Sequence, residues 1–280
     1  MPAQFDTPVA SPSNAHASAL ALRWSGIGLV AASWISAASF GMYILAFYLG
    51  AIPAGRLDQW NGNLPGLYQP GNLAALAAIS AHFATGAVIL LLGPLQLIGE
   101  IRSRWPAFHR WAGRLYIITA AIAGLGGLGF IAAKGTIGGA QMDVGFGLYG
   151  ALVVVAAIET YRHARSLRFE KHRAWAIRLF ALAIGSWLYR MDYGMWLTAA
   201  HGLGHTETFR GPFDIVMSYF FYIPNLALAE LFLRTRNLRL RPAVAAWTAV
   251  LLNASTLFVS VGSYYFLRYY WGPAIIHRLL

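Results

Sequence analysis

Residues 109–116 read HRWAGRLY, and residues 172–180 read HRAWAIRLF, so the chain contains nearly the same phrase twice. With one gap after His-Arg, the two phrases agree at six positions and align Tyr116 with Phe180. We call them the HR phrases. Each stands at the start of a hydrophobic stretch, which predicts two related helical units.

The similarity also extends backwards along the chain. Gln96 lies thirteen residues before His109, and Glu159 lies thirteen residues before His172. A polar side chain therefore precedes each histidine at the same spacing, near the end of the preceding hydrophobic stretch. Any function assigned to this protein has to account for these two histidines.

The composition indicates a membrane protein. Of 280 residues, 58% are hydrophobic and only 11% are charged, whereas soluble chains are about 25% charged. Several apolar runs approach or exceed the ~20 residues that span a bilayer. The chain has no cysteine, which excludes disulfides, thiolate metal sites, iron–sulfur clusters and c-type haem attachment.

The hydrophobic pattern predicts an all-α integral membrane protein with about seven transmembrane helices. Residues 1–22 are rich in Ala, Ser and Pro and are expected to form a disordered tail. Residues 23–280 are expected to form a single polytopic membrane domain. The seven expected spans are residues 24–49, 73–98, 110–133, 144–162, 174–200, 214–233 and 243–267.

The basic residues predict the orientation. The loops after the second, fourth and sixth spans hold 13 of the 21 Lys and Arg residues, whereas the alternating loops hold only Arg56, Lys134 and Arg210. Basic loops stay in the cytoplasm, so the N-terminus is expected inside and the C-terminus outside, in a bacterial cytoplasmic membrane. The excess charge is expected to contact anionic lipids rather than nucleic acid.

Both HR phrases follow an inward-running span and begin an outward-running one. Units of about 73–133 and 144–200 would therefore form a parallel repeat, closing as a central four-helix bundle of two helical hairpins. His109 and His172 would then lie at equal depth, with Gln96 and Glu159 facing them. Facing helices build cofactor sites in bundles in this way.

A second interpretation of the HR phrases stays open. Trp111 and Trp175 suit the head-group region, and the arginines could extend to lipid phosphates. Both phrases would then be interface anchors with no ligand. This interpretation does not explain why His109 and His172 recur, or why a polar residue precedes each by thirteen positions.

Two further residues are predicted at membrane depth. His82 lies about nine residues into the second span, where a neutral imidazole could bind haem iron or simply be satisfied by a neighbouring hydroxyl. Arg190 lies in the fifth span and needs an anionic partner. Asp192 faces away on a helix, so a haem propionate, a lipid phosphate or a carboxylate from another span are the candidates.

Other patterns are given structural interpretations. Glu159, Arg178 and Glu230 are expected to form interhelical ion pairs. The HGLGH stretch at 201–205 is expected to be a loop, because its two glycines disfavour a helical metal site. GLGGLG at 124–129 matches a dinucleotide fingerprint only formally, because it lies within a span; there its glycines allow close helix approach or leave room for a flat cofactor.

The chain resembles an uncharacterised bacterial membrane family, domain of unknown function 2306. The resemblance is carried by His82, GPLQ at 93–96 and the two HR phrases, and it covers roughly residues 75–235. It implies the membrane topology and no activity. The arrangement is also similar to b-type cytochromes such as cytochrome b561 and the ferric reductases, although four mid-helix histidines are not present.

These observations lead to a hypothesis of a membrane redox protein that binds one b-type haem and exchanges electrons with quinone. His109 and His172 are the preferred axial ligands and His82 the next candidate. Gln96 and Glu159 are expected to orient the imidazoles, and Arg190 to lie near the cofactor. The alternatives are a small-molecule or proton-coupled transporter, with His82, Arg190 and Glu230 along a polar path, and a non-catalytic subunit of a larger complex. The expected partners are a membrane redox protein or a second copy of the chain.

Overall fold

The structure is a computed structural model that describes residues 12–235 and 241–279, and within these ranges it contains helices and no strand. The longest helices are α1 (Pro12–Tyr43), α3 (Leu73–Leu97), α5 (Pro106–Lys134), α6 (Ala140–Arg165) and α11 (Pro242–Phe266). The shorter α-helices are α2 (Trp60–Asn63), α4 (Gly99–Arg104), α7 (Phe169–Ala183), α8 (Gly185–Ala199), α9 (Pro212–Phe220), α10 (Ile223–Thr235) and α12 (Gly272–Leu279). The chain is an all-helical, multi-pass membrane protein.

Six stretches in the described residues are long and apolar enough to cross a membrane: 17–49, 73–97, 106–134, 140–165, 212–234 and 242–276. They correspond to six of the seven expected spans. The expected fifth span, 174–200, is instead divided into α7 and α8, of 15 residues each. The division occurs at Ile184, before Gly185, where a Cβ would lie 3.2 Å from the Phe221 carbonyl oxygen. Close backbone contact accompanies the interruption.

The first helix starts earlier than expected. Helix α1 begins at Pro12, so residues 12–22 of the predicted disordered tail are helical, and residues 1–11 lie outside the described residues. Proline suits the first turn of a helix, and the alanines that follow have the highest helix propensity. The Ala-rich composition that suggested disorder is thus compatible with a longer helix.

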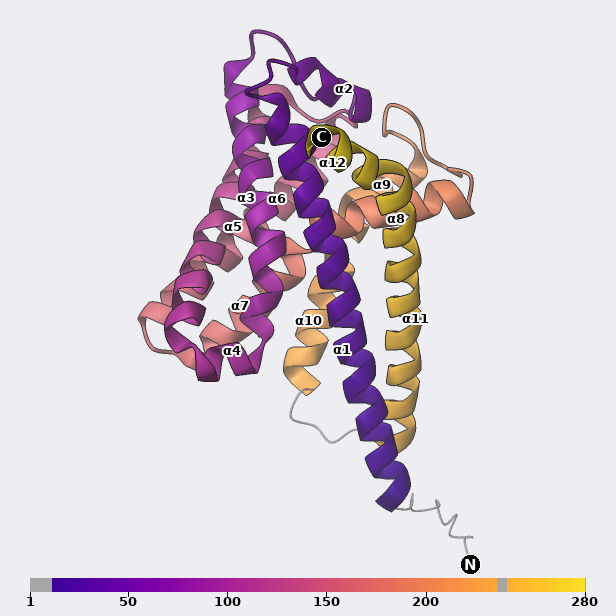
Figure 1. Ribbon diagram of the computed structural model, residues 1–280. Helices are drawn as coiled ribbons and strands as arrows, with labels where there is room; N and C mark the ends of the chain where they lie inside the picture. Colours follow the sequence, from indigo (N-terminus) through magenta and orange to yellow (C-terminus); the bar gives the residue numbers. More distant parts are fainter. Residues whose placement is uncertain (1–11, 236–240, 280) are drawn as a thin grey trace, which may run out of the picture.

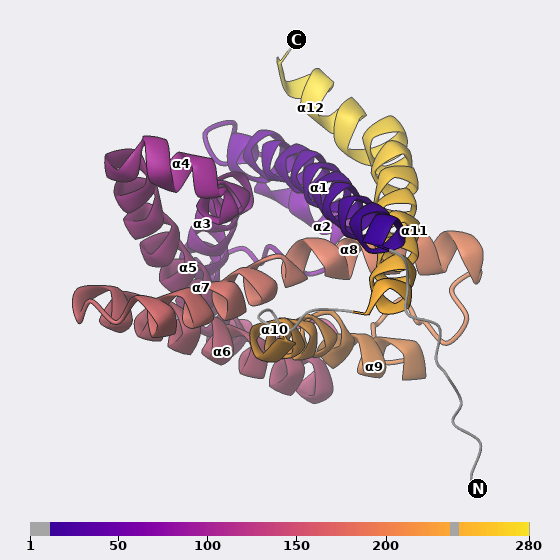
Figure 2. The ribbon, with the colours of Figure 1, turned by 90° about the horizontal axis from the view of Figure 1, so that it is seen from below.

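Helices α3, α5, α6 and α7 pack in chain order, α3 on α5, α5 on α6 and α6 on α7, and α7 also contacts α3. Helices α1 and α11 pack together beside this group. Figure 2 shows α7 and α8 following one another across the molecule, from the α3–α5–α6 side to α11. The α7–α8 segment therefore joins the two parts of the protein.

The two ends of the protein differ in charge. One end carries α4 and the α6–α7 connection, and we call it the α4 end; the opposite end carries α2 and α12, and we call it the α2 end. The basic residues of the α4 end are Arg102, Arg104, Arg110, Arg114, Arg162, Arg165, Arg168, Lys171 and Arg173. The basic loops after the second and fourth expected spans thus lie at the same end of the protein. Of the basic residues in the loop after the sixth span, the structure describes Arg234 and Arg241.

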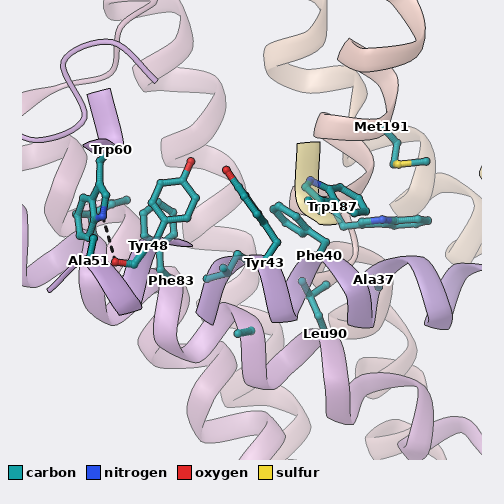
Figure 3. Close-up of a cluster of buried hydrophobic side chains, with 14 of the residues drawn as sticks. Ala37, Phe40, Tyr43, Tyr48, Ala51, Trp60, Phe83, Leu90, Trp187 and Met191 are labelled. Atoms are coloured by element: carbon teal, nitrogen blue, oxygen red, sulfur yellow. Dashed lines mark hydrogen bonds between the residues drawn. The ribbon is translucent and has the colours of Figure 1, made fainter. Parts of the chain in front are cut away.

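One buried contact ties α8 to the first helix. Trp187 on α8 donates its indole N–H to the Ser36 hydroxyl on α1 at 3.0 Å, and both side chains are fully buried. Figure 3 shows Trp187 beside Phe40 and Ala37 of α1. Buried polar groups are normally paired, so this hydrogen bond fixes the position of α8 against α1.

Candidate functional site

The HR phrases have the same local structure. The Arg114 guanidinium lies over the Trp111 ring at 5.0 Å, and Arg178 lies over Trp175 at 4.8 Å. Each phrase thus begins its helix with a cation–π pair at an i,i+3 spacing. This arrangement supports the interface-anchor interpretation of the tryptophans and arginines, and leaves the histidines to be considered separately.

His172 and Glu159 do not contact one another as expected. His172 Nδ1 pairs with the backbone carbonyl of Thr160 at 3.0 Å. The Glu159 carboxylate pairs with Arg162 and, at 3.4 Å, with His163. Glu159, Arg162 and His163 all lie on α6, so the Glu159 carboxylate pairs locally. The Thr160 backbone carbonyl, rather than Glu159, orients the His172 imidazole.

His109 and Gln96 have different surroundings from their counterparts in the second unit. His109 Nδ1 and Gln96 Nε2 are buried without a hydrogen-bond partner among the described residues. Gln96 Oε1 lies 3.0 Å from where a Cβ of Gly113 would be, so the amide packs against α5. The helices of the two HR phrases both pack on α3, where the Tyr116 and Phe180 rings meet at Gly93. Neither His109 nor His172 lines the large cavity described below.

His82 lies on α3 against α5. Its Nδ1 lies 2.8 Å from the Ala123 carbonyl oxygen, and a Cβ at Gly127 would lie 3.4 Å from that nitrogen. A carbonyl oxygen only accepts hydrogen bonds, so Nδ1 carries the hydrogen and Nε2 holds the lone pair. The imidazole lines the cavity. This is the orientation in which a protein holds a histidine as a metal ligand.

The glycines of GLGGLG contribute both features that the sequence suggested. A Cβ at Gly126 would lie 2.7 Å from the Ala78 carbonyl oxygen, and one at Gly124 would lie 3.0 Å from that of Gly150. These two glycines therefore allow α5 to approach both α3 and α6. Gly124 and Gly127 also line the cavity, where the missing side chains leave room beside the α5 backbone.

Arg190 faces the same cavity from α8. Its Nη1 donates to the Ser186 carbonyl at 2.9 Å, and its guanidinium lies 4.8 Å from the Phe40 ring centroid. Among the described residues, no carboxylate oxygen lies within 4.0 Å of this guanidinium; Asp192 does not pair with it. A cation at membrane depth normally has an anionic partner, so Arg190 is available to an anionic group in the cavity.

The cavity has a volume of about 1350 Å³, larger than the ~300–1,000 Å³ of typical ligand pockets. It extends from His82 in the middle of α3 to the loops at residues 64–67 and 134–137 of the α2 end. Figure 3 shows Tyr43 and Tyr48, which line it, with their hydroxyl oxygens on one side of the aromatic cluster around Phe40 and Phe83. The walls are thus mainly apolar and rich in aromatic rings, with a few polar groups.

Residues 79–233 match the family described as "Predicted membrane protein (DUF2306)". The chain belongs to this family. The matched range covers more than half of the chain and includes both HR phrases, His82 and Arg190. No curated protein and no solved structure matches the chain, so the similarity to b-type cytochromes gains no support from these comparisons.

The family match does not include the whole cavity. Phe40, Tyr43 and Tyr48 from the region of α1, and Gly262 and Phe266 of α11, also line it, and all lie outside residues 79–233. The DUF2306 region therefore supplies His82 and Arg190, whereas the flanking helices close the cavity around them.

A polar cluster that no sequence pattern predicted surrounds Asp214, which is fully buried. Its Oδ1 is 2.6 Å from His205 Nδ1 and accepts from the Tyr193 hydroxyl at 2.7 Å, and its Oδ2 accepts from the backbone N–H groups of Thr206 and Gly211. The loop prediction for 201–205 is confirmed, because this stretch is a turn with positive φ at His201, Gly202 and Gly204. The sequence signal that could have indicated this cluster is Asp214 itself, which follows His205 of the predicted loop by nine residues.

The remaining predicted charges form a pair away from the cavity. Arg178 on α7 donates through Nε and Nη2 to the two carboxylate oxygens of Glu230 on α10. Glu230 does not line the cavity, so it does not share a polar path there with His82 and Arg190. Within the described residues, no group of three or more His, Asp or Glu side chains is placed to hold a metal ion.

Proposed function

We propose that this protein is a membrane redox protein that binds one b-type haem in the large cavity. The observation that carries the proposal is that His82 and Arg190, from α3 and α8, line the same cavity. His82 would be an axial ligand through Nε2, and Arg190 would pair with a propionate. When bound, haem would supply one-electron chemistry, with quinone as the electron partner.

The residues present fit the cofactor on three counts. The Ala123 carbonyl fixes the His82 tautomer that leaves Nε2 free. Arg190 has no carboxylate partner among the described residues, and a propionate is an anion. Gly124 and Gly127 leave space along one wall, and aromatic rings of the size of Phe40 and Tyr48 suit a flat apolar macrocycle.

This proposal moves the preferred iron ligand from the HR phrases to His82. His109 and His172 do not line the cavity, and further along the same helices the rings of Tyr116 and Phe180 pack tightly on Gly93. His82 lines the cavity together with Arg190, and its Nδ1 pairs with the Ala123 carbonyl. The HR phrases then position α5 and α7 rather than the iron.

The orientation proposed with this function places the α4 end in the cytoplasm of a bacterium, with the protein in the cytoplasmic membrane. The support is the concentration of arginines at that end and the tendency of basic loops to stay inside. Anionic lipids would contact these arginines. The cavity would then extend toward the external side.

The test is the absorption spectrum of protein purified from haem-replete cells, recorded oxidised and after reduction with dithionite. The proposal expects a Soret band and, on reduction, an α-band, with about one haem per chain by extraction. Protein that is folded and shows neither band would contradict it. In that case the second candidate, transport of an amphiphilic anion, is favoured by Arg190 in a cavity that reaches the loops of the α2 end.

A further inference from the structure

The described residues contain three buried side-chain polar atoms without a hydrogen-bond partner: Gln96 Nε2, His109 Nδ1 and Tyr116 Oη. All three belong to α3 and α5, and we call these three residues the polar column. Leaving such an atom unpaired is destabilising, and native proteins usually satisfy it with protein groups or ordered water. Three such atoms on one helix pair therefore require an explanation.

The three side chains follow the α3–α5 contact in order. A Cβ at Gly93 would lie 3.2 Å from the Tyr116 ring, and a Cβ at Gly113 would lie 3.0 Å from Gln96 Oε1. Residues 93 and 96 are one turn apart on α3, and residues 116, 113 and 109 descend α5 by successive turns. Tyr116, Gln96 and His109 thus occupy successive levels toward the α4 end.

The polar column connects two different environments. At one end, His109 lies in the first turn of α5, next to Arg110, at the charged α4 end. At the other, Tyr116 belongs to a buried cluster that includes Ile89 and Val153, which line the cavity. The polar column is therefore a continuation of the cavity through the otherwise apolar half of the bundle.

We infer that ordered water completes the hydrogen bonds of Gln96, His109 and Tyr116, and that this hydrated column conducts protons between the α4 end and the cavity. A buried water needs two to four polar partners, which these side chains and the nearby backbone provide. Hydroxyl groups and water both donate and accept hydrogen bonds, so a proton passes along them by exchange. The side chains keep their resting charge throughout.

This inference does not rest on haem. The cavity reaches the loops of the α2 end, so the polar column and the cavity together cross the helical region whatever ligand the cavity binds. The column gives the HR phrase of α5 a role beyond anchoring. It also explains why a glutamine precedes His109, whereas the corresponding Glu159 forms a local ion pair on α6.

The test uses the full chain reconstituted in vesicles that contain a pH-sensitive dye. A potassium gradient with valinomycin imposes a membrane potential, and the rate of proton entry is compared with protein-free vesicles. The inference expects wild-type protein to increase the rate, and Gln96→Leu and Tyr116→Phe to return it to the protein-free level. The controls are Gln141→Leu and Tyr161→Phe, which change the same residue types at exposed positions.

Two results would overturn the inference: wild-type vesicles that are no more permeable to protons than protein-free vesicles, or variants that conduct as the wild type does. Tyr116→Phe removes a single oxygen atom, so it tests the path even if Gln96→Leu fails to fold. Thermal unfolding gives an independent measurement. If the groups were simply unpaired in a dry interface, the apolar variants would raise stability and leave proton entry unchanged. No haem signal is used, so failure of the haem proposal leaves this test valid.

Discussion

Tyr116 and Phe180, the aligned last residues of the two HR phrases, lie against the same residue of α3. A Cβ atom at Gly93 would be 3.2 Å from the Tyr116 ring and 3.3 Å from the Phe180 ring. The repeated phrase therefore directs two aromatic rings from α5 and α7 onto one small residue. Its structural role is to bring both helices against α3.

Replacing Gly93 tests this convergence. Gly93→Ala adds a Cβ that both rings must move to accommodate, and overpacking of this kind costs roughly 1–3 kcal/mol. Gly86→Ala on the same helix meets nothing within 4 Å and should gain about 0.5–1 kcal/mol of helix propensity. In detergent, we expect Gly93→Ala to lower the unfolding temperature and Gly86→Ala to raise it.

Residue 93 also precedes Pro94, where any Cβ is disfavoured in a helix. The same Gly93→Ala substitution in a Phe180→Ala background separates the two effects, because one ring is then absent. A smaller loss in that background supports the ring contact. An equal loss would show that the Phe180 ring contributes nothing to the cost.

The buried Trp187–Ser36 hydrogen bond should contribute measurably to stability. Ser36→Ala leaves the Trp187 indole N–H buried and unpaired, at a cost of roughly 1–3 kcal/mol. Ser39→Ala, three residues along the same helix, removes only an exposed hydroxyl that bonds its own helix, and should change stability by less than about 0.5 kcal/mol. Equal unfolding temperatures for the two variants would contradict this role.

If haem is bound, the ligand assignment is decided by three alanine variants. His82→Ala should abolish the haem spectrum, whereas His109→Ala and His172→Ala should retain it. Arg190→Gln should lower the haem content without changing the ligand set, because it removes a counter-charge and not an iron ligand. Loss of the spectrum in both HR variants with retention in His82→Ala would restore the bis-histidine site that the repeat predicted.

Asp214 should hold the 201–211 loop in place. Asp214→Asn removes a buried carboxylate that pairs with His205 Nδ1 and with other hydrogen-bond donors, and it places an amide N–H₂ among these donors. Each buried donor left unpaired costs roughly 1–3 kcal/mol. We expect a lower unfolding temperature and faster tryptic cleavage after Arg210. The control is Asp58→Asn at an exposed position, which should behave as wild type. Unchanged cleavage in Asp214→Asn would show that the loop is held by other contacts.

The absence of cysteine makes the orientation directly testable. Ser166→Cys lies at the α4 end and Gly62→Cys near α2, and both positions are exposed. In intact cells, a membrane-impermeant maleimide should label Gly62→Cys and leave Ser166→Cys unlabelled until the membrane is opened. The reverse pattern would place the α4 end outside and invert every sidedness argued from the arginines.

Composition and spacing predicted much of the fold. The six candidate spans follow directly from hydrophobic length, because each is a long apolar stretch, although 212–234 is divided into α9 and α10. The division at Ile184 could not be predicted in this way, because it depends on the approach of the Gly185 and Phe221 backbones across 36 positions of sequence. Periodicity describes a helix and its faces, but not the tertiary contacts that interrupt it.

The candidate site was predicted less completely. His82 and Arg190 were singled out because ionisable residues are rare in membrane spans, and both line the cavity. The cavity itself was not predicted, because it requires residues from α1 and α11 that no local motif marks. Glu159 was paired with His172 by spacing alone, whereas in the folded chain its carboxylate pairs with Arg162 and His163, which follow it on the same helix.

The bent α7–α8 segment has a consequence for biogenesis. Each half has 15 residues and is therefore about 22 Å long, shorter than the ~30 Å hydrocarbon core of a bilayer. Neither half offers the insertion machinery a complete hydrophobic span. Its place in the bilayer depends on helices made both earlier and later, through Ser36 of α1 and the contacts of α8 with α11. The α7–α8 segment leaves the ribosome before α11, so we expect its final insertion to follow the synthesis of α11.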